Sequence, residues 1–128
     1  MEFAVFLTKA RENQEAAQLC RSHGLYNACA ARAYYAMFQA AVAILLAQGF
    51  IFEPRKHLDH AQIQSLFANE LINRRKIFQS KFRSYLYDAS FLRAIADYKA
   101  ISISQAQANR QMQKLQKFIA AIQQEIPS

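Results

Sequence analysis

One stretch, residues 27–48, most constrains how this chain can fold. It contains no Gly or Pro and is rich in Ala, the strongest helix former, and Gly49 follows it where a helix is expected to end. Its apolar residues run nearly all the way round a helix, which predicts the buried central helix of a bundle. Arg32 and Gln39 interrupt it and, seven positions apart, return to nearly the same face. This cation on the central helix is the first candidate functional residue.

The rest of the composition favours an all-α fold. The 128 residues include two Gly and two Pro, so turns are few and the elements between them are long. No segment alternates apolar and polar residues long enough to predict a sheet. A chain of this length forms one domain, residues 1–128. We therefore expect an up-and-down bundle of four or five helices.

Helical periodicity and capping residues delimit the expected helices. Asp59 is expected to cap the third helix and Ser80 the fourth, while Ser104 followed by Gln107 predicts a capping box at the start of the last one. The expected helices span residues 2–22, 27–48, 60–76, 80–98 and 104–126.

Several classes of protein do not fit the sequence. The N-terminus lacks a basic start and a small-residue cleavage site, so no signal peptide is expected. Polar residues interrupt every long apolar run, so we expect no membrane span. Cys20 and Cys29 form no metal or redox motif and are interpreted as reduced core residues of a cytoplasmic protein. No metal-ligand spacing or glycine-rich phosphate loop occurs, so no cofactor is expected.

The net charge of +7 is concentrated in the middle of the chain. Residues 55–99 carry nine basic and four acidic side chains, including the run Arg74, Arg75 and Lys76. This surplus favours a polyanion such as RNA, or an acidic protein partner. The alternative is a basic surface, ending in a charged helix terminus, that is simply solvated.

Several phrases along the chain resemble one family. They are KARENQEAA at 9–17, GLYNACA at 24–30, ARAYYAMFQAA at 31–41, LRAIADY at 92–98 and SQAQANR at 104–110. Together they are similar to the HEPN superfamily, and within it to the small stand-alone HEPN proteins often encoded beside a minimal nucleotidyltransferase (MNT). The resemblance covers nearly the whole chain, and its most specific parts are RAYYAMF and ADY.

The resemblance implies a helical bundle that commonly forms a homodimer through the helices carrying the site. Many such proteins are metal-independent endoribonucleases, and some are the toxin of a toxin–antitoxin pair whose antitoxin is the nucleotidyltransferase. Their motif is an Arg, four to six residues, then a His. The Arg can hold the phosphate while the His transfers a proton as the ribose 2′-hydroxyl attacks phosphorus.

This sequence departs from that motif. Arg32 is in place, but Gln39 stands where similar proteins often carry His, and Gln cannot transfer a proton near neutral pH. Arg93 opens a second candidate, yet it is followed by Asp97 and Tyr98 and by no His. A third match, Arg55 to His60, lies away from the usual place, and we interpret its spacing as chance.

Each candidate also has a structural interpretation. Arg32 could pair with Asp97 or Tyr98 inside the bundle, and Asp97 could orient Arg32 for a ligand. Tyr35 could be a core or interface aromatic, and Gln39 a polar residue of a dimer interface. His57, in the loop before the third helix, could mark the helix entry or act as a substitute base.

The leading hypothesis is a toxin-type or RNA- or nucleotide-binding HEPN protein whose ribonuclease motif is degenerate. Its catalytic candidates are Arg32, Gln39 and His57, and its binding candidates are Tyr35, Arg74, Arg75, Arg93, Asp97 and Tyr98. The alternative is a non-catalytic homodimeric module that binds a partner protein. A third hypothesis is an active nuclease that uses His57 or His60 as its base.

Overall fold

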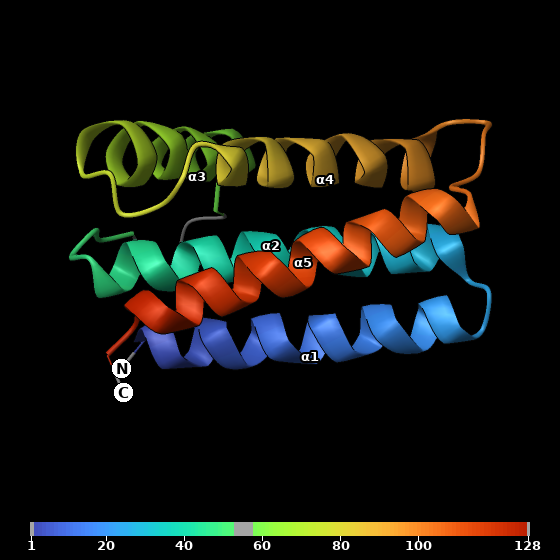
Figure 1. Ribbon diagram of the computed structural model, residues 1–128, viewed down its shortest axis with the longest axis horizontal. Coiled ribbons are helices and arrows are strands. Elements are labelled where there is room, and N and C mark those ends of the chain that lie inside the picture. The colour runs from blue at the N-terminus through green and yellow to red at the C-terminus, as the bar shows by residue number, and fades with distance from the viewer. Residues whose placement is uncertain (1, 53–57, 128) are drawn as a thin grey trace.

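The computed structural model describes residues 2–52 and 58–127, and every regular element within them is helical. The elements lie roughly along one long axis, and the start of α1 lies at the same end of the bundle as the end of α5 (Figure 1). This confirms the predicted all-α bundle. In chain order the elements are α1 (Glu2–Ser22), α2 (Tyr26–Ala47), α3 (His60–Leu66), the π-helix η1 (Phe67–Arg74), α4 (Lys81–Tyr98) and α5 (Gln105–Glu125).

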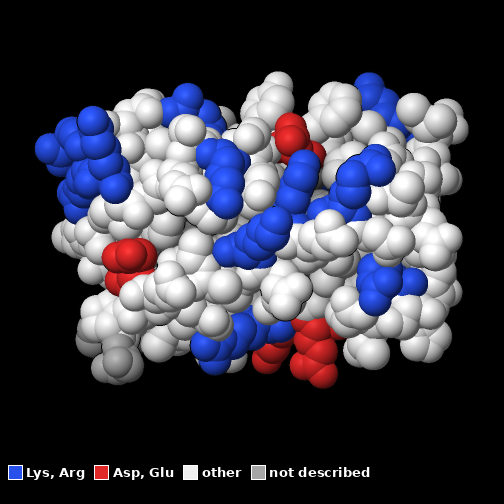
Figure 2. All heavy atoms as spheres, viewed as in Figure 1, with Lys and Arg blue, Asp and Glu red and all other residues white. Residues whose placement is uncertain are grey.

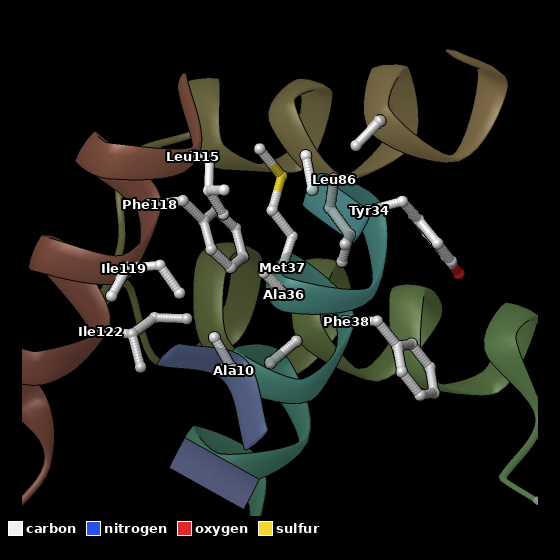
Figure 3. Close-up of a cluster of buried hydrophobic side chains, with 14 of the residues drawn as sticks. Ala10, Tyr34, Ala36, Met37, Phe38, Leu86, Leu115, Phe118, Ile119 and Ile122 are labelled. Carbon is white, nitrogen blue, oxygen red and sulfur yellow. The ribbon is translucent and has the colours of Figure 1, made fainter. Parts of the chain in front are cut away.

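The bundle is built around α2, as its apolar circumference predicts. This helix contacts α1, α3, α4 and α5, and its side chains meet those of α1, α4 and α5 in one core cluster (Figure 3). By length and composition alone α2 could cross a membrane. However, 72% of that apolar window is buried inside the bundle, which is what the core helix of a helical domain requires.

Small residues let α1 and α2 approach each other closely. Ala10 and Ala17 of α1 are completely buried, as are Ala33 and Ala40 of α2. The small residues of α2 therefore serve packing against the other helices of the same chain.

Two of the three predicted helix caps are confirmed. Oδ1 of Asp59 accepts hydrogen bonds from the backbone N–H groups of Ala61 and Gln62, at 2.9 and 3.3 Å. The capping box is complete, with Ser104 and Gln107 bonding each other's backbone N–H at 3.1 and 2.9 Å. The prediction for Ser80 is wrong, because its backbone is already helical and its side chain makes no capping bond.

The third predicted helix does not stay α-helical through residues 60–76. After α3 it widens into η1, where the N–H of Arg75 still bonds five residues back, to the carbonyl of Glu70 at 2.9 Å. The wider turn brings positions four and five apart onto one face, so Phe67, Leu71 and Ile72 are all buried. An α-helix would turn Ile72 away from the core, which explains the change of helix type.

Candidate functional site

Arg32 is exposed, not enclosed in the bundle. Its Nη1 donates a 3.1 Å hydrogen bond to Oδ1 of Asn13 on α1, and its guanidinium lies 5.2 Å from the centre of the Tyr35 ring. The alternative interpretation, a pairing of Arg32 with Asp97 or Tyr98, is not seen among the described residues, where Asp97 contacts Arg93. Because the guanidinium stays in contact with water, α2 carries this charge without the cost of a buried ion.

Asn13 connects Arg32 to Gln39. While its Oδ1 accepts from Arg32, its Nδ2 donates to Oε1 of Gln39 at 2.7 Å. The seven-residue spacing on α2 thus places both side chains within reach of one residue of α1. Sequence reasoning did not select Asn13 as a site residue. The available signal was its polar amide within the apolar row of the first helix.

A second guanidinium lies in the same region, from α4. The centre of the Arg93 guanidinium lies 5.3 Å from the Tyr34 ring, 5.8 Å from Tyr98 and 6.0 Å from Tyr35. Its Nη1 reaches Oδ2 of Asp97 at 3.9 Å, the long limit of an ion pair. The Nε atom is buried and has no hydrogen-bond partner among the described residues. Arg93 therefore has donors to spare for an incoming acceptor.

Tyr35 joins the two cations, because both Arg32 and Arg93 lie over its ring. The ring face attracts cations, which allows the two like charges to share one neighbourhood. We call Arg32, Tyr35, Arg93 and Tyr98 the arginine–tyrosine cluster. It unites the RAYYAMF and LRAIADY segments, which are about sixty residues apart in the sequence.

His60 reaches the edge of this cluster from α3. Its Nδ1 lies 2.5 Å from the hydroxyl of Tyr34, and its ring stacks on Phe38 with 4.2 Å between the ring centres. In Figure 3 the Tyr34 hydroxyl points away from the core cluster. Burial raises the pKa of Tyr34 above its usual 10.0, so the phenol stays protonated at neutral pH. Arg55, the other half of the match that we interpreted as chance, lies outside the described residues.

Other predicted site residues are not brought to the cluster. Arg74 pairs with Glu70 at 3.1 Å, and Arg75 donates to the backbone carbonyl of Gln48 at 3.2 Å, beyond the C-terminal end of α2. At a rise of about 1.5 Å per residue, Gln48 lies about 24 Å from Arg32 along the helix axis. His57 lies outside the described residues.

The surface around the helices is predominantly basic. Figure 2 shows Lys and Arg side chains spread over the face that α4 and α5 form, with acidic side chains in a few isolated places. Within residues 2–52 and 58–127, no group of three or more His, Cys, Asp or Glu side chains is arranged to hold a metal ion. The candidate chemistry therefore centres on the two guanidinium groups and the rings around them.

A protein-family model for the HEPN domain matches residues 3–126. The chain belongs to the HEPN family. A search of curated proteins finds none that matches it. The match spans all the described helices, so both arginines of the cluster belong to the HEPN domain itself.

This arrangement in the HEPN domain suits binding better than proton transfer. Two guanidinium groups present forks of N–H donors that match phosphate oxygens, and exposed Tyr98 offers a ring on which a base can stack. Gln39 supplies an amide, which does not transfer a proton near neutral pH, and Asn13 already occupies its Oε1.

Proposed function

We propose that this HEPN domain binds a phosphate of RNA or of a nucleotide at the arginine–tyrosine cluster, without cleaving the strand. The observation that carries the proposal is the state of Arg93. Its side chain is only 19% exposed, its ion pair with Asp97 is 3.9 Å long, and Nε has no partner among the described residues. A largely buried cation with unused donors is stabilised by an oxyanion.

Arg32 and the neighbouring rings extend the proposed site. Arg32 is exposed beside Tyr35, so it can contact a second oxygen of the same phosphate or the next phosphate along a strand. Tyr98 is 75% exposed and offers a stacking surface for a base. The net charge of +7 adds a long-range attraction for any polyanion.

The proposal of binding without cleavage rests on Gln39. In a motif of the HEPN type the second residue transfers a proton, and an amide does not do so near neutral pH. Among the described residues, His60 is the imidazole at the edge of the cluster, and Tyr34 is hydrogen-bonded to its Nδ1. If the protein is an active nuclease, His60 or His57 must take the missing role.

Binding is tested with a fluorescein-labelled single-stranded RNA of about ten nucleotides, a length within the site sizes of single-strand binding domains. Fluorescence anisotropy should give a Kd that rises about tenfold in Arg93→Ala and severalfold in Arg32→Ala. Arg74→Ala is the matched control, since it removes an equal charge far from the cluster. Equal losses in all three variants would reduce the proposal to non-specific charge attraction.

Cleavage is tested separately, on total RNA. We expect no degradation by the wild-type protein beyond that of Arg32→Ala. Gln39→His restores the imidazole of the motif, and cleavage gained by this variant identifies a decayed ribonuclease. Degradation by the wild type that disappears in His60→Ala or His57→Ala contradicts the non-cleaving proposal.

We also propose that the protein acts in the cytoplasm beside a nucleotidyltransferase antitoxin. This proposal follows from the resemblance to HEPN proteins encoded with MNT partners. A short nucleotidyltransferase gene next to this one, whose product co-purifies with the chain and relieves growth arrest on co-expression, supports it. A chain that does not slow growth when expressed alone is not a toxin.

A second candidate function is a non-catalytic homodimeric interaction module, and the surface of α4 favours it. Tyr87, Phe91, Ala94 and Tyr98 follow one another at spacings of four, three and four residues, the repeat of a helix-pairing seam. The three aromatic residues are 64%, 61% and 75% exposed. They leave roughly 300–500 Å² of aromatic surface in water, a large part of the about 800 Å² that each partner buries in a stable interface.

A second copy of the chain is the occupant that fits this seam. An antiparallel pair of α4 helices brings Asp97 of one copy toward Lys81 and Arg83 of the other. Arg93 and Lys99 lie at the same end as Asp97, so the exposed rings contribute more to the pairing than the charges do. Sedimentation should show a dimer that Phe91→Glu abolishes and that Leu19→Glu, an equally drastic change on exposed α1 surface, leaves intact. A wild-type monomer at micromolar concentration contradicts this candidate.

A further inference from the structure

A cavity of about 200 Å³ lies between α4 and α5, away from the arginine–tyrosine cluster. Met37 of α2 and Ala89 of α4, both buried, contribute apolar lining. Tyr85 and Phe91 of α4 add two aromatic rings. An apolar cavity of about 150 Å³ accommodates benzene, so this one has room for a single aromatic ring with substituents.

One hydrogen-bond acceptor beside this cavity has no donor among the described residues. Gln111 is only 2% exposed, and its Oε1 has no hydrogen-bond partner among the described residues. Its Nε2 donates to the carbonyl of Ala30 at 3.4 Å, a long hydrogen bond. Since buried acceptors are nearly always satisfied, Oε1 calls for an N–H or O–H donor. The cavity beside Gln111 is where a ligand could bring one.

The charged side chains that line the cavity are two cations and one carboxylate, and Gln107 adds a neutral amide. Arg110 is exposed and forms no ion pair with any described residue. Lys114 pairs with Asp88 at 3.6 Å and lies 5.7 Å from the Tyr85 ring. Two cations against one carboxylate leave a surplus positive charge, which favours an anionic group on the ligand.

We propose that this cavity binds a small aromatic acid that carries a hydrogen-bond donor on its ring. The ring packs against Tyr85 and Phe91, and its donor bonds Oε1 of Gln111. Its carboxylate lies toward Arg110 and Lys114. The proposed ligand is the size of a substituted benzoate, and the site is independent of the phosphate site proposed above.

The probe is 4-aminobenzoate, titrated into the full chain with carbon-13 label in the methionine methyl groups. Met37 lines the cavity, whereas Met112 lines the separate groove between α1 and α5, so the two methyl signals form an internal control. We expect a saturable shift of the Met37 signal and no shift of Met112. Equal shifts of both signals, or no saturable shift, overturn the proposal.

The role of Gln111 is tested with 4-methylbenzoate, which has a similar shape but no donor. The wild type should bind 4-aminobenzoate about tenfold more tightly than 4-methylbenzoate, the effect of one satisfied buried acceptor. Gln111→Leu keeps an apolar side chain of similar length and should remove this preference while still binding 4-methylbenzoate. Retention of the preference in Gln111→Leu overturns the assignment of Oε1. If Gln111→Leu does not fold, the wild-type preference decides alone.

The cationic lining is tested with Arg110→Ala, and Lys117→Ala is the control because Lys117 carries the same charge on α5 outside the cavity. We expect Arg110→Ala to weaken 4-aminobenzoate binding severalfold and Lys117→Ala to leave it unchanged. Adenosine monophosphate is titrated in parallel. A shift of Met37 with the nucleotide and none with 4-aminobenzoate overturns the aromatic acid and assigns the cavity to a nucleotide base.

Discussion

Nδ2 of Asn13 donates a 2.7 Å hydrogen bond to Oε1 of Gln39. The same Asn13 accepts from Arg32. Both of these polar side chains of α2 are therefore held by one amide on α1. This contact couples the geometry of the proposed phosphate site to the packing of α1 on α2.

The coupling is measurable with a double-mutant cycle. We expect Asn13→Ala and Gln39→Ala to show an interaction energy of about 1 kcal/mol in urea unfolding, because they share one partly buried hydrogen bond. The cycle cancels the higher helix propensity of Ala. Strictly additive losses in stability would show that the 2.7 Å contact contributes nothing.

The shape of the Arg93 side chain, beyond its charge, is expected to matter. Arg93→Lys keeps the cation but loses the planar fork and the stacking on three tyrosines. We expect RNA affinity to fall about tenfold, with the slope of affinity against salt nearly unchanged. The same exchange at Arg74 is the control. An Arg93→Lys variant that binds RNA as well as wild type argues for a purely Coulombic role.

Of the two predicted serine caps, Ser104 forms a capping bond in the structure and Ser80 does not. Ser104→Ala removes one half of a complete capping box and should cost about 1 kcal/mol of unfolding free energy. Ser80 makes no capping bond, so Ser80→Ala should change stability by less than about 0.5 kcal/mol. Chemical denaturation of the two variants side by side checks this, and equal losses would contradict the difference.

Lys76 holds a left-handed backbone conformation, with φ of 53°, after the end of η1. A side chain there costs roughly 1–2 kcal/mol relative to Gly, which has no Cβ to clash. Lys76→Gly should therefore raise the stability, by about 1 kcal/mol after the added freedom of the unfolded chain is subtracted. A lower midpoint of thermal unfolding in Lys76→Gly contradicts this expectation.

We expect ionisation of the Cys29 thiol to lower the free energy of unfolding at alkaline pH. Burial raises the pKa of its thiol from 9.0 to about 11, because the thiolate is poorly solvated inside the bundle. The unfolded chain then loses the thiol proton at a lower pH than the folded chain does. The stabilising contribution of the Cys29 thiol is therefore complete below pH 9 and is lost as pH rises toward 11. The wild type should lose about 2 kcal/mol more than Cys29→Ala across that interval, measured by urea unfolding. If the unfolding free energies of the wild type and of Cys29→Ala change equally with pH, Cys29 is not the cause of the loss.

Much of the fold followed from local sequence signals. The first and last helices have the predicted bounds to within one residue, because their caps and apolar rows lie within a few residues of one another. The change to η1 could not be predicted in this way. It depends on burying Ile72 together with Phe67 and Leu71, which is a demand of the surrounding core and not of the segment.

The sequence predicted which residues lie together in the arginine–tyrosine cluster better than it predicted their individual contacts. Arg32, Tyr35, Arg93 and Tyr98 were selected from two separate phrases, and they do lie together. Their pairing was assigned wrongly. Asp97 lies four residues after Arg93 on the same helix and meets it there, whereas the partner of Arg32 came from α1.

By itself, the sequence determined that α2 is a central helix and that the domain is a helical bundle of the HEPN type. These properties depend on residue identity and on periodicity along one helix, which can be read locally. Only the tertiary structure decided that Arg32 stays in contact with water, that Asn13 joins it to Gln39, and that no described residue bonds the side-chain oxygen of Gln111 beside a cavity. Such contacts depend on how separate helices cross, and the pattern of one helix does not specify which residue of another will face it.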